Sequence, residues 1–475
     1  MMIRALTSSA ISGVSRTILQ FLTILYLTTF LNSADYGLYA FTLPFTILTT
    51  ILFDAGFGPL VVRPKTIEPS MISSLHRLAI IVGLCSCMVL FAGSFAAERF
   101  VADPRFPGAL RLMAVVPFLG LTGAVPRAVL ERHLDYGMIA KIEIGALSVA
   151  SAVSIGAALL GAGIWSLFAL SIIQALLRCA LFNAIAKVSF RGRNIHLAQI
   201  YADGKWITLQ NLQVYCNRNL DNILVGAYLG SSVLGAYALA YQIILVPLQA
   251  AAWPFGAVLL SILRRLHRPE EQINALNGTM LLTLWVIVPT VSLAAAIVPE
   301  VTALFLSRSW RSLPFLVQAL SVSCIAQVLG SFCGTILISQ NQLRLNFYIG
   351  LVNTIILSAI FLISTIFFDI EVMVSIYAVY SIVFGIALLW LGYQKLGERS
   401  LKFATALAPP MVVGAAIALS ALVLNAALAD ASATSRLVAK FAAFLSIASV
   451  GFLFQWTDLR ALFASFKGEA SVSYR

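Results

Sequence analysis

Charged and amide side chains interrupt an otherwise apolar stretch of this chain. Residues 204–230 read GKWITLQNLQVYCNRNLDNILVGAYLG, which sets Arg218, Asp221 and Asn222 inside a segment long enough to cross a membrane. Insertion scales place Arg or Asp at the centre of a membrane helix at a cost of about 2.5 to 3.5 kcal/mol, so such residues usually face protein or water. We therefore expect this segment to line a pathway.

The polar side chains share one face of a helix. At 100° per residue, a helix over 206–229 brings Asn211, Tyr215, Arg218 and Asn222 within about 60° of one another, with Asp221 beside them. The first apolar segment carries a second stripe: Ser8, Ser12, Ser15, Arg16, Gln20 and Thr23. The simplest arrangement has both stripes facing a shared central cavity. Its predicted substrate-binding residues are Arg16, Gln20, Asn211, Tyr215, Arg218 and Asn222.

Arginine gives such a cavity a chemical preference. A guanidinium is always charged and offers planar donors that match phosphate oxygens. Because Arg16 and Arg218 lie in the two stripes, we predict an anionic substrate.

Each charge also has a structural interpretation, and both stay open. Arg218 and Asp221 are three residues apart and can neutralise one another on a helix. Arg16 and Arg178 lie near the predicted inner interface and can snorkel. Asp54, in the string FDAGFG, can cap the helix break at its glycines.

Composition defines the class. Hydrophobic residues make up 60% of the 475 and charged residues 11%, which is outside the range of soluble domains. Apolar runs of about 18 to 25 residues recur, each long enough to cross a hydrocarbon core as a helix. We predict an all-α polytopic membrane protein with about fourteen transmembrane helices. The expected spans are 9–31, 38–61, 77–97, 110–130, 142–161, 164–186, 206–229, 233–262, 278–298, 314–338, 345–367, 372–392, 403–426 and 436–456.

Two details of these spans lead to expectations. Pro247 and Pro254 are expected to kink the eighth span. Lys141 and Glu143 begin the fifth span and are interpreted as interfacial.

The net charge of +12 is explained by topology rather than by nucleic acid binding. When the loops are numbered alternately, most Lys and Arg residues fall on one side, which is the positive-inside signature. We expect a multi-pass protein of the bacterial inner membrane with cytoplasmic N- and C-termini and no nucleic acid partner. The N-terminal segment lacks a small-residue cleavage site and is expected to stay as the first helix.

The chain also repeats itself. An offset of 198 residues aligns LNSADYGLYA with LGSSVLGAYA, pairing Ser33 with Ser231 and Gly37 with Gly235. A six-span period keeps both halves in one orientation and predicts two pseudo-symmetric six-helix lobes around the cavity. The expected domains are residues 1–200, with the cytoplasmic linker, then 201–398, and a terminal helix pair with a cytoplasmic tail in 399–475.

Motifs for catalysis or metal binding are not found. Gly204-Lys205 is followed by Trp206 and does not form a P-loop. The six cysteines fall within predicted spans and the four histidines are scattered, so we expect no disulfide, no metal and no cofactor. Energy for transport would come from an ion gradient, the membrane potential or consumption of product.

Four strings carry a family resemblance: SSAISGVSRTILQFLTILYLTTFLNSADYGLYAF, FDAGFG, PRAVLERHLDY and NRNLDNILVGAYLGSSVLGAYALAYQI. They resemble the polysaccharide-transport flippases of the multidrug, oligosaccharidyl-lipid and polysaccharide exporter superfamily, in particular the Wzx-type lipid-linked oligosaccharide flippases. The similarity covers roughly residues 5 to 400 and is specific for family, not for substrate.

The resemblance implies a function. An alternating-access cycle would carry an undecaprenyl-pyrophosphate oligosaccharide from the cytoplasmic to the periplasmic leaflet for exopolysaccharide or lipopolysaccharide biosynthesis, with its lipid tail among membrane lipids. Arg16 and Arg218 would then hold pyrophosphate or acidic sugar, and Asp54 and Asp221 would be coupling or gate residues for H+ or Na+. A polymerase and a chain-length regulator would work alongside it.

Two alternatives remain at this point. One is a cation-coupled drug exporter of the same superfamily, which should have more cavity acids than arginines. The other is a membrane-embedded glycan polymerase or ligase, which would need a larger periplasmic loop. Because the predicted outer loops are short, we predict a transporter and not an enzyme.

Overall fold

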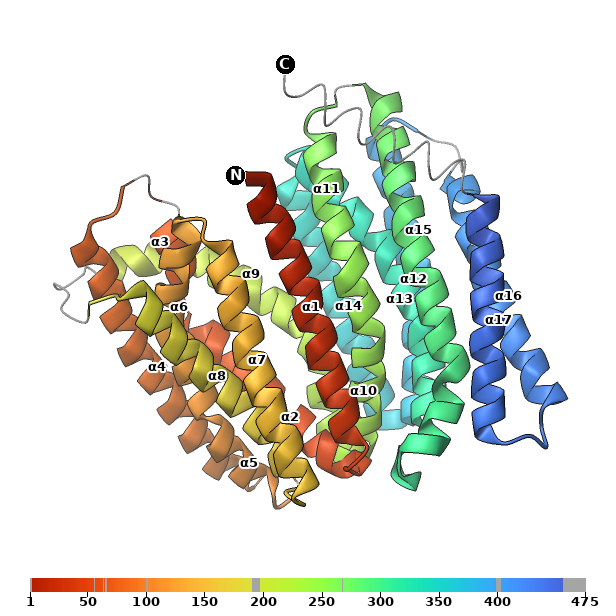
Figure 1. The fold of residues 1–475 in the computed structure, drawn as a ribbon. Coiled ribbons are helices and arrows are strands. Elements are labelled where there is room, and N and C mark those ends of the chain that lie inside the picture. Colours follow the sequence, from red (N-terminus) through yellow and green to blue (C-terminus); the bar gives the residue numbers. More distant parts are fainter. Residues whose placement is uncertain are drawn as a thin grey trace. The chain divides into compact units, whose positions relative to one another are not determined.

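The chain folds into helices joined by short connections (Figure 1). The computed structural model describes residues 2–54, 56–62, 64, 66–99, 101, 103–189, 197–266, 268–398 and 403–455, and within these ranges the side chains of 2–12, 197–210 and 403–406 are not described. The helices are α1 (Met2–Thr28), α2 (Ser33–Phe53), α3 (Phe57–Val62), α4 (Pro69–Ala97), α5 (Phe106–Met113), α6 (Val115–Arg132), α7 (Tyr136–Leu159), α8 (Trp165–Ala186), α9 (Leu197–Leu224), α10 (Ser231–Pro247), α11 (Trp253–Leu263), α12 (Pro269–Phe305), α13 (Leu313–Ser339), α14 (Leu343–Phe367), α15 (Ile370–Lys395), α16 (Phe403–Ala427) and α17 (Ala433–Phe454).

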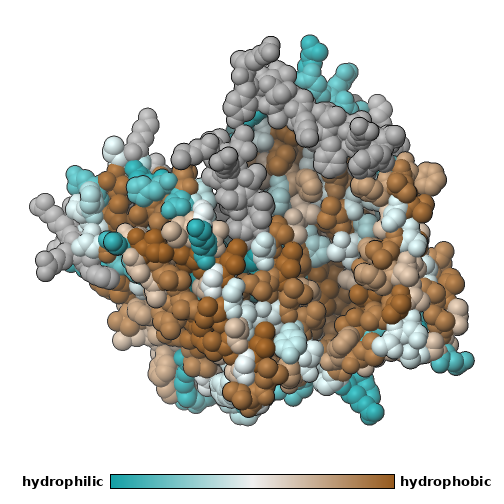
Figure 2. All heavy atoms as spheres, viewed as in Figure 1, coloured by the Kyte–Doolittle hydropathy of each residue, from teal (hydrophilic) through white to brown (hydrophobic). Residues whose placement is uncertain are grey.

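The predicted all-α membrane architecture is confirmed. Among the described residues, twelve helical stretches are long and apolar enough to cross a membrane. Together with α1 and α9, which carry the polar stripes, they correspond one for one to the fourteen predicted spans. On the visible face apolar side chains cover most of the helices' length, and hydrophilic ones gather near helix ends (Figure 2).

The chain divides into two compact units. The first contains residues 1–238 and 351–370, and the second contains 239–350 and 371–475. The predicted lobe boundary near residue 200 adjoins 190–196, which lie outside the described residues, as does the tail from 456. Those predicted domain limits stay predictions.

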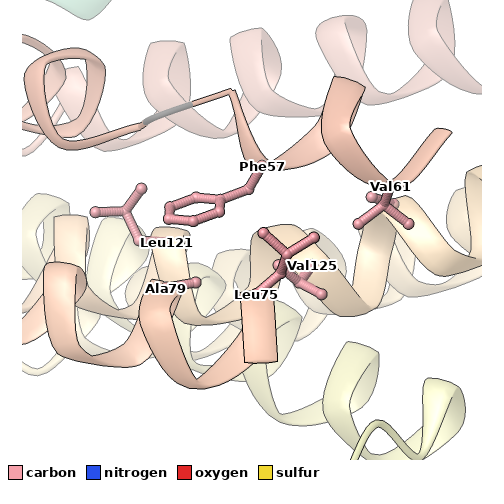
Figure 3. Packing of buried hydrophobic residues seen from close by; sticks show 7 residues of the cluster. Phe57, Val61, Leu75, Ala79, Leu121 and Val125 are labelled. Atoms are coloured by element: carbon pink, nitrogen blue, oxygen red, sulfur yellow. The ribbon is translucent and has the colours of Figure 1, made fainter. Parts of the chain in front are cut away.

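In the first unit, a broken helix packs on α4 and α6. Asp54 is the C-cap of α2, and its Oδ1 accepts hydrogen bonds from the backbone N–H of Gly56 at 3.0 Å and of Phe57 at 3.2 Å. Gly56 has a φ of +76°, a left-handed conformation that favours glycine. Phe57 and Val61 of α3 are then buried in an apolar cluster with Leu75, Ala79, Leu121 and Val125 (Figure 3). The capping interpretation of Asp54 matches this geometry.

The two aligned strings of the internal repeat meet each other in the first unit. A Cβ atom on Gly37 would collide with the carbonyl oxygen of Ser231, and one on Gly235 would collide with the carbonyl oxygen of Ser33. Ser33 Oγ also lies 2.7 Å from Ser232 Oγ. The contact is therefore reciprocal between positions that the 198-residue offset relates. Only glycine permits this approach of backbones where α2 and α10 begin.

A polar cluster lies beside this crossing, in the connection between α4 and α5. Arg105 contacts Asp35 at 2.6 Å and Asp103 at 3.1 Å, and Ser231 donates to Asp103 at 3.3 Å. Burial raises the pKa of Asp103, but its hydrogen bonds from Arg105 and Ser231 and the charge of Arg105 outweigh burial and hold that pKa below its usual range. A carboxyl group whose pKa is lowered by folding stabilises the fold at any pH above its pKa in the unfolded chain. This stabilisation is lost as the pH falls through the lower pKa of the folded protein.

The second unit joins the terminal helices α16 and α17 to α12. Lys440 Nζ of α17 donates to both oxygens of Glu300 of α12, at 2.8 and 2.7 Å, and to the carbonyl oxygen of Ala296 at 2.8 Å. Lys440 and Glu300 are each 3% exposed. This unit also confirms the predicted distortion of the eighth span, because a π-helical turn, Leu248–Ala252, separates α10 from α11 between Pro247 and Pro254.

Candidate functional site

Three arginines from different helices surround one carboxylate in the first unit. Arg16 Nη1 of α1 lies 2.7 Å from Glu143 Oε2 of α7. Arg178 Nη2 of α8 lies 3.5 Å from Glu143 Oε1, and Arg127 Nη2 of α6 lies 3.7 Å from the same oxygen. Arg127 Nε also contacts Glu131 at 3.2 Å. We call Arg16, Arg127, Arg178 and Glu143 the arginine cluster.

Helix geometry places the cluster at one depth. Arg127 lies five residues before the end of α6, Glu143 seven residues after the start of α7, and Arg178 eight residues before the end of α8. The connectivity puts these three helix ends on one side, so each residue is about 8 to 12 Å inside the bundle at 1.5 Å per residue. Arg127, Glu143 and Arg178 lie within stretches apolar enough to span a membrane.

Local contacts fix two of these helices. Asp135 caps α7 by accepting a hydrogen bond from the backbone N–H of Met138 at 3.1 Å. Thr23 lies two turns beyond Arg16 on α1, and Ser151 lies two turns beyond Glu143 on α7. Thr23 Oγ1 donates a hydrogen bond to Ser151 Oγ at 2.9 Å. The polar stripe of α1 thus contacts α7 at two levels, and this holds Arg16 against Glu143.

The cluster carries a net positive charge, and its arginine side chains are partly exposed. The side chains of Arg16, Arg127 and Arg178 are 36%, 41% and 34% exposed, whereas Glu143 is 12% exposed. With Glu131 included, three positive charges stand against two negative ones, which leaves one positive charge in surplus. Such a site favours a ligand with several negative charges and planar oxygen acceptors.

The polar face of α9 contacts three other segments of the first unit. Tyr215, 5% exposed, donates its hydroxyl hydrogen bond to the carbonyl oxygen of Pro44 at 3.1 Å. Tyr237 of α10 donates to Asp221 Oδ2 at 2.6 Å, and Asp221 is 5% exposed. Asn353 Nδ2 of α14 donates to Asn217 Oδ1 at 3.3 Å. Several polar side chains of α9 therefore form hydrogen bonds with neighbouring helices.

The predicted site residues thus fall in different surroundings. Gln20 and Asn211 are half-buried, and Arg218 is exposed. Asn222 is half-buried, with its side-chain oxygen buried and without a hydrogen-bond partner in the described part of the chain. No group of His, Cys, Asp and Glu suited to a metal ion occurs among the described residues. The shared cavity, and the substrate or gating roles of these residues, stay predictions.

Sequence reasoning did not single out Arg127, interpreted Glu143 as interfacial and gave Arg178 snorkelling as its structural interpretation. Each of these residues, taken alone, lies near a helix end, where a charge has an ordinary interfacial explanation. The sequence did contain a sign of the cluster. Glu143, Arg127 and Arg178 each lie five to eight residues from a helix end on the same side of the bundle.

Comparisons with known proteins give the class and then the family. Among solved structures, the lipid II flippase MurJ in an inward closed conformation matches with a TM-score of 0.63 at 15% identity, covering 94% of this chain and 98% of MurJ. The chain therefore shares the fold of that membrane protein. The model of the family described as polysaccharide biosynthesis protein matches residues 26–314, and the chain belongs to that family.

Curated relatives carry names from the same field. The lipopolysaccharide biosynthesis protein WzxC of Escherichia coli (strain K12) is 22% identical over 334 residues, covering 68% of this chain and 67% of WzxC. The teichuronic acid biosynthesis protein TuaB of Bacillus subtilis (strain 168) is 23% identical over 313 residues, covering 64% of each chain. The chain thus spans close to two thirds of the length of these relatives.

Proposed function

We propose that this protein is a flippase that moves a polyprenyl-pyrophosphate-linked oligosaccharide from the cytoplasmic to the periplasmic leaflet of a bacterial inner membrane. The observation that carries this proposal is the arginine cluster in a membrane-transporter fold of the polysaccharide biosynthesis family. Three guanidiniums at one depth provide donors for the two phosphates of such a lipid. A polymerase and a chain-length regulator would act on the product.

The charge balance also separates the transport alternatives. A pump for organic cations needs an excess of acids in its binding site, whereas the arginine cluster with Glu131 has a surplus of positive charge. The positive-inside distribution of Lys and Arg in the sequence supports cytoplasmic termini. The depth of the cluster would then place it toward the cytoplasmic leaflet, where lipid-linked repeat units are expected to be made.

The decisive experiment compares cells with and without the protein for the leaflet in which the lipid-linked oligosaccharide accumulates. We expect intact repeat units to be trapped on the cytoplasmic face when the protein is missing. Units that reach the periplasm unpolymerised would contradict the flippase proposal and favour a polymerase.

The site is tested with Arg178→Ala at matched protein level in the membrane. We expect polysaccharide export to fall about tenfold or more, because a charge-assisted contact to phosphate is lost. Arg178→Lys should restore only part of it, since lysine lacks the planar set of donors. The matched control is Arg308→Ala, outside the cluster, which should export normally. Wild-type export by Arg178→Ala would remove the cluster from the substrate site.

A further inference from the structure

Glu143 is the least exposed member of the arginine cluster, although it is the group that all three guanidiniums approach. Its side chain is 12% exposed, whereas each arginine is at least 34% exposed. The carboxylate is therefore the most enclosed group of the cluster, and the arginine side chains around it are partly exposed.

The three contacts with Glu143 are unequal. Arg16 is held at 2.7 Å, a strong charged hydrogen bond, while Arg178 and Arg127 lie at 3.5 and 3.7 Å. The Nε atom of Arg178 is buried and makes no hydrogen bond in the described part of the chain, whereas Nε of Arg127 lies 3.2 Å from Glu131. Two carboxylates do not satisfy all the N–H groups of three guanidiniums, so donor capacity remains at this site.

A carboxylate and a phosphate compete for the same donors. A guanidinium can bind two oxygens of a planar carboxylate or two oxygens of a tetrahedral phosphate at once. An anion that binds Arg16, Arg127 and Arg178 together must weaken their contacts with Glu143, because each guanidinium has a fixed set of five N–H groups.

We propose that Glu143 is an internal counter-anion that holds the three arginines together in the unloaded protein and that a phosphate-bearing substrate displaces. This inference rests on the proposed function and adds to it a residue that sets substrate selectivity. Without Glu143 three like charges would repel one another in a medium of low dielectric constant. With it, binding becomes an exchange of one anion for another.

Exchange explains selectivity and release. A ligand with one negative charge only replaces what Glu143 already supplies, whereas a pyrophosphate brings two or more charges and more acceptors. The same competition keeps binding from becoming too tight, because Glu143 regains the guanidiniums when the substrate leaves.

The test measures equilibrium binding of radiolabelled inorganic pyrophosphate to the full chain in a non-ionic detergent free of phosphate. The variants are Glu143→Gln, Glu143→Asp and the control Glu98→Gln. Glu98 is 50% exposed and pairs with Arg111, so the control changes net charge equally away from the cluster. We expect Glu143→Gln to lower the Kd for pyrophosphate about tenfold, because the competing anion is gone. Glu98→Gln should match wild type.

Glu143→Asp guards against a fold that depends on a carboxylate at this position. It keeps the charge but retracts it by one methylene from Arg16, so its Kd should fall between those of wild type and Glu143→Gln. If wild type binds pyrophosphate and neither variant binds it more tightly, the counter-anion proposal is overturned while the proposed function stands. If pyrophosphate binds neither wild type nor Glu143→Gln, both are overturned.

A second arm separates two sources of phosphate. Phosphatidylglycerol added to the micelles carries a single charge on a phosphodiester and should displace pyrophosphate only weakly. Displacement at equal concentrations would show that the cluster holds ordinary lipid head groups, and this outcome would also overturn the assignment of Glu143 to substrate selectivity.

Discussion

Glu300 and Lys440 show how a buried charge is tolerated in this protein. Each is 3% exposed, and Lys440 places three hydrogen bonds on Glu300 and on the carbonyl oxygen of Ala296. Arg436 Nε lies 3.9 Å from Glu300, too far for a hydrogen bond. Lys440 is therefore the partner that neutralises Glu300, and the pair ties α17 to α12.

Removing one partner should cost more than removing both. Glu300→Gln or Lys440→Met alone leaves a buried charge uncompensated, and we expect each to destabilise the fold by about 3 to 5 kcal/mol. The double variant should regain most of that loss, since only the partly exposed Arg436 keeps a charge there. Thermal unfolding in detergent measures this, with Glu98→Gln as the exposed control. A double variant that is as unstable as the sum of the two single ones would contradict this account.

The contrast with the arginine cluster lies in what covers each carboxylate. Both Glu143 and Glu300 are predominantly buried, but Lys440 is itself covered, whereas the arginines around Glu143 are a third or more exposed. Both acids are in long apolar helices, so the sequence alone presents them alike. Their different surroundings come from which helices pack together, and hydropathy does not carry that information.

At the scale of helices, the two repeated strings contact each other through glycine. Gly37 and Gly235 sit one turn into α2 and α10, and each faces the carbonyl oxygen of the serine that begins the other helix. Gly120 of α6 is a useful comparison, because nothing lies within 4 Å of the position its Cβ would take.

Gly37→Ala and Gly235→Ala should each lower the stability of the fold by about 1 to 3 kcal/mol, because the added methyl group meets backbone that must shift. Gly120→Ala should be neutral or slightly stabilising, since it only reduces the freedom of the unfolded chain. Unfolding midpoints of the three purified variants give the comparison. Equal midpoints for Gly37→Ala and Gly120→Ala would mean that α2 and α10 can separate there at no cost.

Much at this scale follows from sequence. The apolar runs predicted fourteen helices, and Pro247 and Pro254 predicted a distortion of the eighth span, where a π-helical turn lies. Several helix ends were not predicted, since α4 begins at Pro69 and α12 ends at Phe305, outside the expected spans 77–97 and 278–298. The repeat alignment identified Gly37 and Gly235 as equivalent, but that they touch is a tertiary fact.

At the scale of the whole molecule, the proposed transport needs a source of energy, and an ion gradient is one of the sources that the sequence leaves open. We propose that Asp221 is the group that takes up the coupling proton. It is 5% exposed, and Tyr237 donates a hydrogen bond to it at 2.6 Å. A carboxylate buried in a membrane helix is costly when charged, and this cost favours its protonated form.

Coupling is measured in proteoliposomes as the acceleration of lipid-linked oligosaccharide translocation by an imposed pH gradient. Wild type should respond, whereas Asp221→Asn, which mimics the protonated acid, should lose the response while keeping the basal rate within a few fold. Tyr237→Phe should reduce the response, because the carboxyl group loses its hydrogen-bond donor. Asp369→Asn makes the same acid-to-amide change at an exposed residue between α14 and α15 and should behave as wild type. A full pH response in Asp221→Asn, or a response to Na+ alone in wild type, would exclude Asp221 as the proton carrier. The coupling ion would then have to be bound by another group.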